Sequence, residues 1–583
     1  MTTIDADLLI RGGTLVDGTG APSRVADVAV KGERVLAVGP ALKANAPEVS
    51  DAAGLLVTPG FVDIHTHYDG QATWEHTLAP STEHGVTTVL TGNCGVGFAP
   101  CRPEDRDRLV KLMEGIEDLP EIVLRTGIPW NWQSFPEYLD ALAARRYDCD
   151  IATQLPHAAL RVFAMGRRAV DREEATPEDR ALMARLAGEA IEAGALGFAT
   201  SRTINHRASD GIPVPTLSAA EEELGAIGEA LGRAGKGVLQ LVSDFADTDT
   251  ELPMLRRIAE RAGRPMSVSL MQWHHAPGKW RTVLDWIEGC NADGVCIRAQ
   301  VSGRPIGLNL GWQLSFNPFS FTPAYRAIAA LPWPERLAQL RDPAVRTRIV
   351  ADTPEPSGFP GEGLMRQWAG IYPLGEEPFY EPTAAESVAS LAAAQGRTPA
   401  ELAYALMMAQ DGEAMLMAPT VNFAGNSLEA ARQMLRHPDA LYGLGDGGAH
   451  LGFLCDASLP THMLQYWVRD RLRGERIPLE EVVHGWTQRA AAAVGLLDRG
   501  VIAAGYKADI NLIDAKEVAL LPPRVRHDLP ANGRRMVQGA RGYAATILSG
   551  TVVRRRGEHT GALPGRLLRG AQDAPAVQGA ARK

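Results

Sequence analysis

The sequence predicts an α/β protein in which a (β/α)₈ TIM-type barrel is joined by a small β domain that both chain termini build. Three observations support this fold class. From about residue 58, β-like runs alternate with amphipathic helical patterns, as expected for parallel strands joined by right-handed crossovers. Enough of these units occur to favour a closed barrel over an open sheet. Short β-like runs also stand before and after this region.

The β domain is predicted from both ends of the chain. The first 57 residues hold too few strands to close a core of their own. A β-like run that ends at Asp514 and another over Thr546–Arg554 supply further strands, so we expect residues 1–57 and 498–556 to form one domain. The N-terminal runs, separated by glycine-containing turns, are Ala6–Ile10, Thr14–Val16, Val25–Val30 and Arg34–Val38.

The barrel is predicted to span residues 58–497. Its β-like runs are Thr87–Thr91, Ile151–Leu155, Gly197–Thr200, Val238–Val242, Met266–Met271 and Ala440–Gly445. Its helical patterns are 103–118, Pro177–Ala193, Ala219–Ala234, Glu251–Arg261, Lys279–Ile287 and 478–496.

Two regions depart from this rhythm. Residues 303–440 are rich in proline and aromatic residues, and we interpret them as an insertion that covers the active face. Its rings suit an apolar acyl or aryl pocket, and packing within the insertion explains them nearly as well. Residues 557–583 are rich in Gly, Ala, Arg and Pro, and this composition predicts a flexible tail. The rings in question are Trp312, Phe316, Phe319, Phe321 and Tyr325.

A His-x-His motif is the strongest functional signal. His65 and His67 follow the apolar run Phe61, Val62, Ile64, which is typical of a buried strand. Residues two apart in a strand project to the same face, so both imidazoles can reach one metal ion. Neutral imidazole is a common zinc ligand. The alternative, two surface histidines, is disfavoured by the preceding Pro-Gly and the hydrophobic strand.

Two further residues extend the predicted metal site. Cys94 follows the strand-like run ending at Thr91, and its thiolate can join the imidazoles, since a metal ion enforces deprotonation. A buried free cysteine is the alternative. Asp446 lies between glycines at the end of the presumed last strand. Its carboxylate can bind metal and accept a proton from water, although an Asp-Gly turn would leave the same pattern.

These motifs together resemble the amidohydrolase superfamily and, within it, the N-acyl-D-amino-acid deacylase group. The resemblance covers nearly the whole chain, and Asn-Cys-Gly after the second strand is the mark of the deacylase group. It implies a distorted (β/α)₈ barrel with metal at the strand C-termini and a β-sandwich from both chain ends. The matching segments are residues 9–20, Thr58-Pro-Gly-Phe-Val-Asp-Ile-His-Thr-His-Tyr-Asp69, residues 85–95, Gly443-Leu-Gly-Asp-Gly-Gly-Ala-His450 and residues 500–509.

The chain departs from this family at the fifth and sixth strands. Family members carry histidine ligands there, whereas this sequence has Gln240 on strand five and Leu270 and Met271 on strand six. We therefore expect Gln240 to contact substrate and the site to hold one ion, Zn²⁺, instead of two. Its four ligands would be His65, His67, Cys94 and Asp446.

Candidate substrate-binding residues surround that site. Gln272 stands where the resemblance places a basic residue that helps hold the substrate carboxylate. Arg202 and His206, after strand four, are candidates to replace it, although a loop-stabilising ion pair is equally compatible with the arginine. His157, at the end of strand three, would orient the substrate carbonyl or support the metal. His450, four residues after Asp446, completes the set.

Composition narrows the possible partners. The 583 residues include 45% hydrophobic and 22% charged residues and carry a net charge of −10, which argues against nucleic acid or an anionic membrane as the main partner. There is no long apolar span and no signal peptide pattern. Six sparse cysteines without a CxxC pair favour a reducing cytoplasm. We expect a small-molecule substrate, and homo-oligomer formation stays open.

The predicted function is hydrolysis of a non-peptide amide C–N bond, as in N-acyl-D-amino-acid deacylases. Asp446 would take a proton from the attacking water and return it to the leaving nitrogen. A related hydrolase of neutral amides, esters, lactones or carbamates is the alternative, because a fold does not fix chemistry. A non-catalytic binding protein is the third hypothesis.

Overall fold

Eight parallel strands form a closed barrel in the computed structural model, which describes residues 3–358 and 361–576. The barrel is closed where the segments that follow its first and last strands meet. Thr66 pairs in parallel with Gly447, and the His67 amide donates to the Gly447 carbonyl at 2.7 Å. The strands are β8 (Phe61–Asp63), β9 (Val86–Thr91), β10 (Asp150–Thr153) continued by β11 (Leu155–Pro156), β12 (Gly197–Arg202), β13 (Val238–Ser243), β14 (Met266–Leu270), β15 (Ile297–Val301) and β19 (Ala440–Tyr442).

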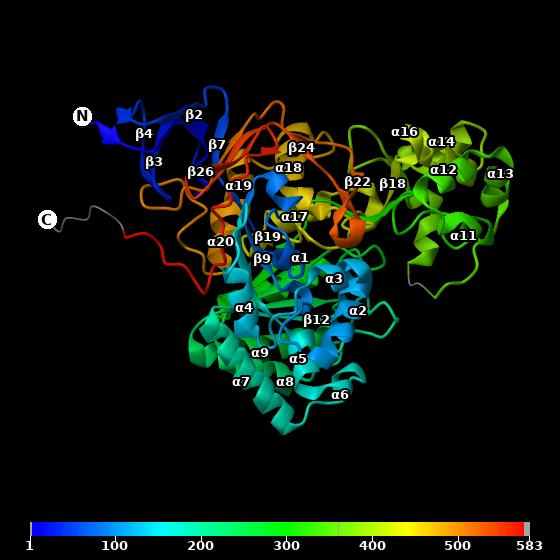
Figure 1. Ribbon diagram of the computed structural model, residues 1–583, viewed down its shortest axis with the longest axis horizontal. Coiled ribbons are helices and arrows are strands. Elements are labelled where there is room, and N and C mark those ends of the chain that lie inside the picture. The colour runs from blue at the N-terminus through cyan, green and yellow to red at the C-terminus, as the bar shows by residue number, and fades with distance from the viewer. Residues whose placement is uncertain (1–2, 359–360, 577–583) are drawn as a thin grey trace.

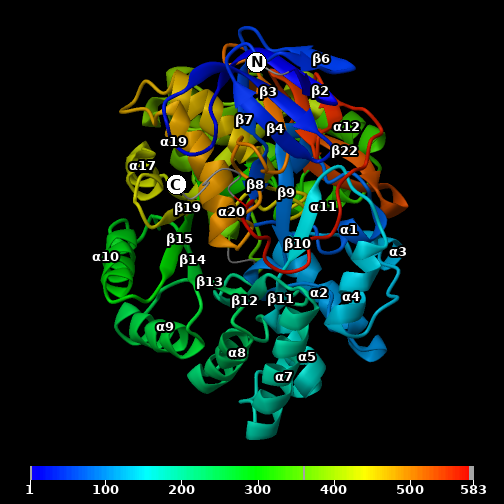
Figure 2. The same cartoon turned by 90° about the vertical axis from the view of Figure 1, so that its left-hand side faces the viewer.

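Amphipathic helices cover the outside of the barrel, and Figure 2 shows α7, α8, α9 and α10 beside β12 to β15. The longest, α7 (Pro177–Ala193), begins at a capping box in which Thr176 and Asp179 satisfy each other's backbone amides. It ends at Gly194, whose φ of 118° suits glycine. The other three are α8 (Glu221–Ala234), α9 (Thr248–Ala262) and α10 (Lys279–Ala292). The predicted barrel fold is thus confirmed.

One barrel strand, β15, was absent from the sequence prediction. Its apolar residues Ile297, Ala299 and Val301 alternate with Arg298 and Gln300, so no continuous apolar run marks it as a barrel strand. Gln300 is nevertheless buried, and the hydrogen bonds of its amide to His65 and Ser267 compensate for the loss of contact with water. A polar residue at an inward position therefore concealed the strand.

Both ends of the chain join one β-sandwich sheet. Its strand order is β27-β26-β25-β20-β7-β2-β3-β4, and β7 (Leu56–Pro59) pairs antiparallel with β20 (Ile510–Ile513) where the two ends meet. Its inner face buries aliphatic side chains such as Ile10, Val28 and Ile547. The remaining bounds are β2 (Leu8–Leu15), β3 (Arg24–Lys31), β4 (Arg34–Gly39), β25 (Tyr543–Leu548), β26 (Thr551–Arg555) and β27 (Glu558–His559).

The insertion forms a lobe at the opposite end of the molecule's long axis from the β-sandwich (Figure 1). An antiparallel sheet of β16 (Ile306–Leu310), β18 (Met415–Val421) and β17 (Tyr372–Leu374) carries helices that include α11 (Pro323–Ala329) and α15 (Pro399–Met407). The helix after this lobe, α17 (Glu429–Leu435), already packs against β15 and β19. It therefore belongs to the barrel, and the lobe ends earlier than residue 440.

The aromatic rings of the insertion are mostly its own core. Trp312, Phe319 and Tyr325 are buried together with Tyr404 and are at most 4% exposed. The pocket interpretation fails for these three, because rings that complete the lobe's only large apolar cluster among the described residues cannot also line an open cavity. Phe316 and Phe321 are partly buried at the edge of this core.

The segment expected to be a flexible tail is fastened to the barrel as far as it is described, to residue 576. Ile151 pairs with Leu567 and Leu496 pairs with Gln572, while Leu567 and Leu568 are buried. Paired backbone and buried leucines compensate for the disorder-prone composition. Residues 577–583 lie outside the described residues. Among the described helices, none has both the length and the apolar character needed to cross a membrane.

Candidate metal centre

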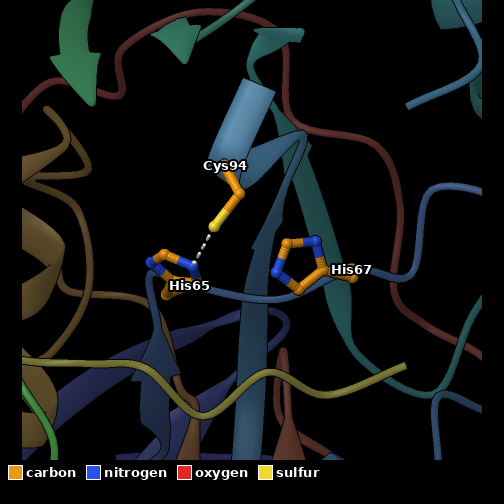
Figure 3. A group of neighbouring side chains, drawn as sticks. All are labelled: His65, His67 and Cys94. Atoms are coloured by element: carbon orange, nitrogen blue, oxygen red, sulfur yellow. Dashed lines mark hydrogen bonds between the residues drawn. The ribbon is translucent and has the colours of Figure 1, made fainter. Parts of the chain in front are cut away.

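The three strand-end residues predicted as ligands converge at the barrel mouth (Figure 3). His65 and His67 follow β8, and Cys94 follows β9. Their donor atoms all lie within 4.8 Å of one another, and the His65 Nε2 to Cys94 Sγ distance is 3.3 Å. Within the described part of the chain, this is the one group of three such side chains that converges in this way. All three are buried.

Asp446 completes the cluster from the loop after β19. Its Oδ1 lies 3.4 Å from His65 Nε2 and 3.7 Å from His67 Nε2. The Asp446 amide donates to the His65 carbonyl at 2.9 Å, so the loop is fixed directly to the His-x-His segment. Asp446 thus lies beside both imidazoles of the three-residue group.

The loops that present Cys94 and Asp446 have unusual backbone conformations. Cys94 has φ 55° and Asp446 has φ 45°, both in the left-handed region that non-glycine residues rarely adopt. Gly92 beside Cys94 has φ 79°, and a Cβ there would lie 2.2 Å from the Gln154 carbonyl oxygen. Glycine is therefore required at that position, which explains the Gly-Asn-Cys-Gly pattern. Such strain is maintained only where surrounding contacts enforce it.

A neutral amide positions His65. The His65 Nδ1 lies 2.6 Å from Gln300 Oε1, and the Gln300 amide nitrogen donates to Ser267 Oγ at 2.9 Å. Because Oε1 can only accept, the Nδ1–H donates to it. The Nε2 lone pair is then free to point toward Cys94 and Asp446, which is the tautomer a metal ligand needs.

A carboxylate positions His67. Glu117, the last residue of α2 (Arg106–Glu117), is 1% exposed, and its Oε1 lies 3.3 Å from His67 Nδ1. Its Oε2 lies 3.6 Å from His450 Nε2. Glu117 and His67 lie at ion-pair distance, and His67 Nδ1 forms no hydrogen bond with a described residue, so the carboxylate acts on the ring through its charge. Glu117 thus links a predicted ligand to a predicted substrate-binding residue.

The electrostatics of the cluster fit a bound cation. Burial lowers the pKa of His65 to about 4 and raises the pKa of Cys94 to about 11. Burial also disfavours the charged form of Asp446, but His67, His65 and His450 hold its pKa below the usual range. A neutral imidazole, a carboxylate and a thiol that a cation can ionise form a donor set for a divalent metal such as zinc.

Three predicted substrate-binding residues are hydrogen-bonded to other parts of the protein. His157 is fully buried, with Nδ1 2.8 Å from Thr200 Oγ1 and Nε2 2.8 Å from Glu223 Oε1. The Arg202 guanidinium donates to Glu251 and to the Ala219 carbonyl. The Gln272 amide nitrogen donates to Pro277, and its oxygen accepts from the Ala424 amide.

Gln240, on the fifth barrel strand β13, contacts the turn that carries Cys94. Its Oε1 accepts the Cys94 backbone N–H at 3.0 Å, and its Nε2 lies 3.5 Å from Ser269 Oγ. The amide therefore supports the strained Cys94 turn. It does so from the position where the resemblance expects a histidine ligand.

His206 and His450 lie in the electrostatic environment of the cluster. Burial, followed by the neighbouring imidazoles of His450 and His67, lowers the pKa of His206 to about 3. Its Nδ1 lies 2.8 Å from Ser201 Oγ. The His450 Nδ1 is buried without a hydrogen-bond partner among the described residues. Its ring contacts Phe453, which in turn contacts Phe316 of the insertion.

Sequence reasoning missed Glu117 and Gln300. Glu117 ends α2, and the next residue, Asp118, has φ 52°, so the helix stops there in a left-handed turn. No local pattern distinguishes such a glutamate from a solvent-exposed one. Gln300 could have been found from the sequence. It lies in a run where the apolar residues Ile297, Ala299 and Val301 alternate with polar ones, a pattern that indicates a strand.

Comparison with known proteins agrees with this geometry. The model of the amidohydrolase family matches residues 48–554. The chain belongs to the amidohydrolase family. This amidohydrolase is 28% identical over 557 residues to the N-acyl-D-aspartate deacylase of Alcaligenes xylosoxydans xylosoxydans, covering 92% of this chain and 93% of that protein. It is accordingly an enzyme that hydrolyses C–N bonds other than peptide bonds.

Solved structures share the fold of this amidohydrolase. A D-aminoacylase whose binuclear metal centre was studied has a TM-score of 0.64 at 24% identity, covering 97% of this chain and 100% of that one. The N-acyl-D-glutamate deacylase of Bordetella bronchiseptica, in complex with zinc and a phosphonate inhibitor, has a TM-score of 0.63 at 22% identity, with the same coverage. These similarities confirm the barrel and β-sandwich architecture.

Proposed function

We propose that this amidohydrolase deacylates N-acyl-D-amino acids with one Zn²⁺ ion held by His65, His67, Cys94 and Asp446. The observation that carries the proposal is the convergence of His65, His67 and Cys94, with the Asp446 carboxylate beside both imidazoles. Relatives named as deacylases of N-acyl-D-aspartate and N-acyl-D-glutamate support the substrate class. The zinc recorded with the Bordetella bronchiseptica structure supports the choice of metal.

The protein's own residues account for the proton transfers. When bound, a divalent cation supplies Lewis-acid chemistry that polarises the amide carbonyl and acidifies water. Asp446, an anion held between two imidazoles, accepts the proton of the attacking water and returns it to the leaving nitrogen. His450 carries a buried, unpaired Nδ1 close to these groups and is assigned to hydrogen-bond the substrate.

The assignment of a single ion rests on the fifth and sixth strands. The Gln240 amide oxygen accepts the Cys94 backbone N–H, and the Leu270 side chain has no atom that can bind a metal. Imidazole ligands are therefore missing on that side of the barrel. The donors present, His65, His67, Cys94 and Asp446, would suffice to hold one ion.

A neutral amide is the second candidate substrate. Arg202, one of the two side chains considered for a substrate carboxylate, is hydrogen-bonded to Glu251, and Gln272, at the position of the family's basic residue, is hydrogen-bonded to loop backbone groups. A substrate without a free carboxylate would not need them.

We also assign the chain to a reducing cytoplasm, because all six cysteines, which lie in the described residues, are free.

The test combines metal analysis with a substrate panel. Purified protein is expected to contain about one zinc per chain and to release amino acids from N-acyl-D-amino acids faster than from their L-enantiomers, neutral amides or esters. Asp446→Asn should lower kcat by about 10²–10⁴-fold, because it removes the proton acceptor. Full activity in Asp446→Asn, or preference for neutral amides, would exclude the primary assignment, and the second result would select the alternative.

A further inference from the structure

A cavity of about 340 Å³ lies at the end of the barrel opposite the metal centre. Val238 and Met266, the first residues of β13 and β14, line it, whereas the predicted metal ligands follow the carboxyl ends of their strands. The far wall is formed by α20 (Ala490–Ala493) and Val494. Most of the lining is aliphatic, with Ile64 and Leu441 completing the inner surface.

Arg489 is the charged group that distinguishes this cavity. It ends the π-helical segment η10 (Gly485–Arg489), which connects α19 (Leu479–His484) to α20. Short π-helical segments are rare and are often found at functional sites. The side chain is partly buried, and it forms neither an ion pair nor a hydrogen bond with any described residue. A second hollow of about 600 Å³ shares Arg489 and Pro438 with the first, so the guanidinium stands where the two meet.

The second arginine of the cavity is already neutralised. Arg298 donates to Asp439 at 2.8 Å. Arg298 is paired and Arg489 is not, among the described residues, so Arg489 is the guanidinium of this cavity that is available to an anion. In the neighbouring hollow, Glu481 is paired with Arg436 and Glu480 accepts the Ser23 amide. A partly buried cation in an apolar surround is favoured by a matching anion.

The chemistry of the lining selects the ligand. A guanidinium presents a planar fork of N–H donors that matches a carboxylate, and one free charge suits a monoanion better than a phosphate. The aliphatic wall suits a short hydrocarbon chain. We propose that this cavity binds a small monocarboxylic acid with a short apolar chain, its carboxylate on Arg489 and its chain between the strand ends and α20.

The position of the cavity gives this site a connection to the metal centre. Its inner lining includes Ser267 and Gln300, and Gln300 both donates to Ser267 Oγ and accepts from His65 Nδ1. An occupant would therefore contact the side chain that positions His65. The site itself does not depend on the proposed deacylase activity, because none of the predicted metal ligands lines it.

The direct test is calorimetric titration of hexanoate into the full-length, metal-loaded protein. We expect saturable binding of one hexanoate per chain, with no binding of hexylammonium, since the cavity carries a positive charge. Arg489→Met should weaken binding by about 30-fold or more, as expected when one partner of a desolvated charge pair is removed. Ala493→Leu places a larger side chain in the cavity from α20 and should abolish hexanoate binding.

The matched control is Arg257→Met. Arg257 lies on α9, outside the lining of both hollows, and is paired with Glu221 at 2.7 Å, so its loss should leave hexanoate affinity unchanged. Near-ultraviolet circular dichroism of every variant verifies folding, and Arg489→Met remains informative if Ala493→Leu does not fold. Absence of saturable binding would overturn the proposal. So would binding that persists in Arg489→Met, because the hexanoate would then occupy another place such as the metal itself.

Discussion

The two halves of the barrel present different chemistry to its centre. The segments after β8, β9 and β19 carry thiol, imidazole and carboxylate donors, namely His65, His67, Cys94 and Asp446. Strands β13, β14 and β15 instead carry amides and hydroxyls, namely Gln240, Ser267, Ser269 and Gln300. One half can bind a cation, and the other half cannot do so with comparable affinity.

The amide half nevertheless acts on the donor half. Gln300 accepts from His65 Nδ1, and Gln240 accepts from the Cys94 backbone. Residues around a metal site that orient the ligands contribute substantially to affinity. The difference between the halves therefore shows a division of roles: one side supplies donor atoms, and the other fixes their direction.

The largest expected effect on zinc affinity comes from removing a donor atom of the proposed metal site. Cys94→Ala removes one of the four proposed donors. If the donors contribute equally to the ~10–16 kcal/mol that such sites gain on binding zinc, the variant loses roughly a quarter of this free energy. Its zinc affinity should then fall by about 100- to 1,000-fold. Metal content measured after dialysis against a weak chelator, together with hydrolysis rate, provides the readout. Cys101→Ala is the matched control, since Cys101 is buried outside the donor group. Equal zinc retention in both variants would contradict the ligand assignment.

A smaller effect is expected from the amide half. Gln300→Leu keeps the side chain's approximate size but loses the acceptor for His65 Nδ1, so zinc affinity should fall by about 10–100-fold while a saturating concentration still fills the site. Chelator competition measures this affinity. Gln272→Leu serves as control because its amide contacts only loop groups among the described residues. If Gln300→Leu bound zinc as tightly as the parent, the proposed division of roles would be wrong.

The smallest expected effect is on the free energy of unfolding, through the pKa of a buried histidine that belongs to neither half. His84 is fully buried between Thr461 Oγ1 and the Gln538 carbonyl, and burial lowers its pKa to about 4 from an ordinary 6.5. The unfolded chain therefore binds a proton that the native protein does not. The stability from neutral His84 is complete above pH 6.5 and is lost as the pH falls toward 4, by about 1 kcal/mol between pH 7 and 5.5.

Urea unfolding at a series of pH values tests this. His84→Gln should show a shallower decline in the free energy of unfolding over that interval than the parent. His76→Gln, which changes an exposed imidazole, should leave the parent's slope intact. A parent slope that His84→Gln does not alter would assign the acid sensitivity to other buried groups.

The sequence predicted those features that local patterns encode. His65 and His67 follow a short apolar strand at period two, so the motif itself indicates both the strand end and the shared face. Cys94 is similarly marked by glycines that the turn requires. The resemblance to amidohydrolases then supplied the architecture, which structural comparison confirms.

Features that depend on distant contacts were not predictable in this way. Glu117 is 50 residues from His67 in the sequence, and only the folded α2 helix brings the two together. The Trp312 ring lies in the core of the lobe because residues far along the chain cover it, such as Tyr404, which is 92 residues later. Burial of this kind is a property of the assembled chain, and a window of sequence does not contain it.

The sheet shared by the two ends of the chain has a consequence for biosynthesis. During translation, β7 emerges some 450 residues before its partner β20, and Ile151 emerges long before Leu567. A ribosome making about 5–20 residues per second leaves the edge of β7 exposed for roughly half a minute or more. The nascent chain must therefore keep an unpaired strand edge from aggregating until its final strands arrive, which makes this seam the natural point for chaperone dependence.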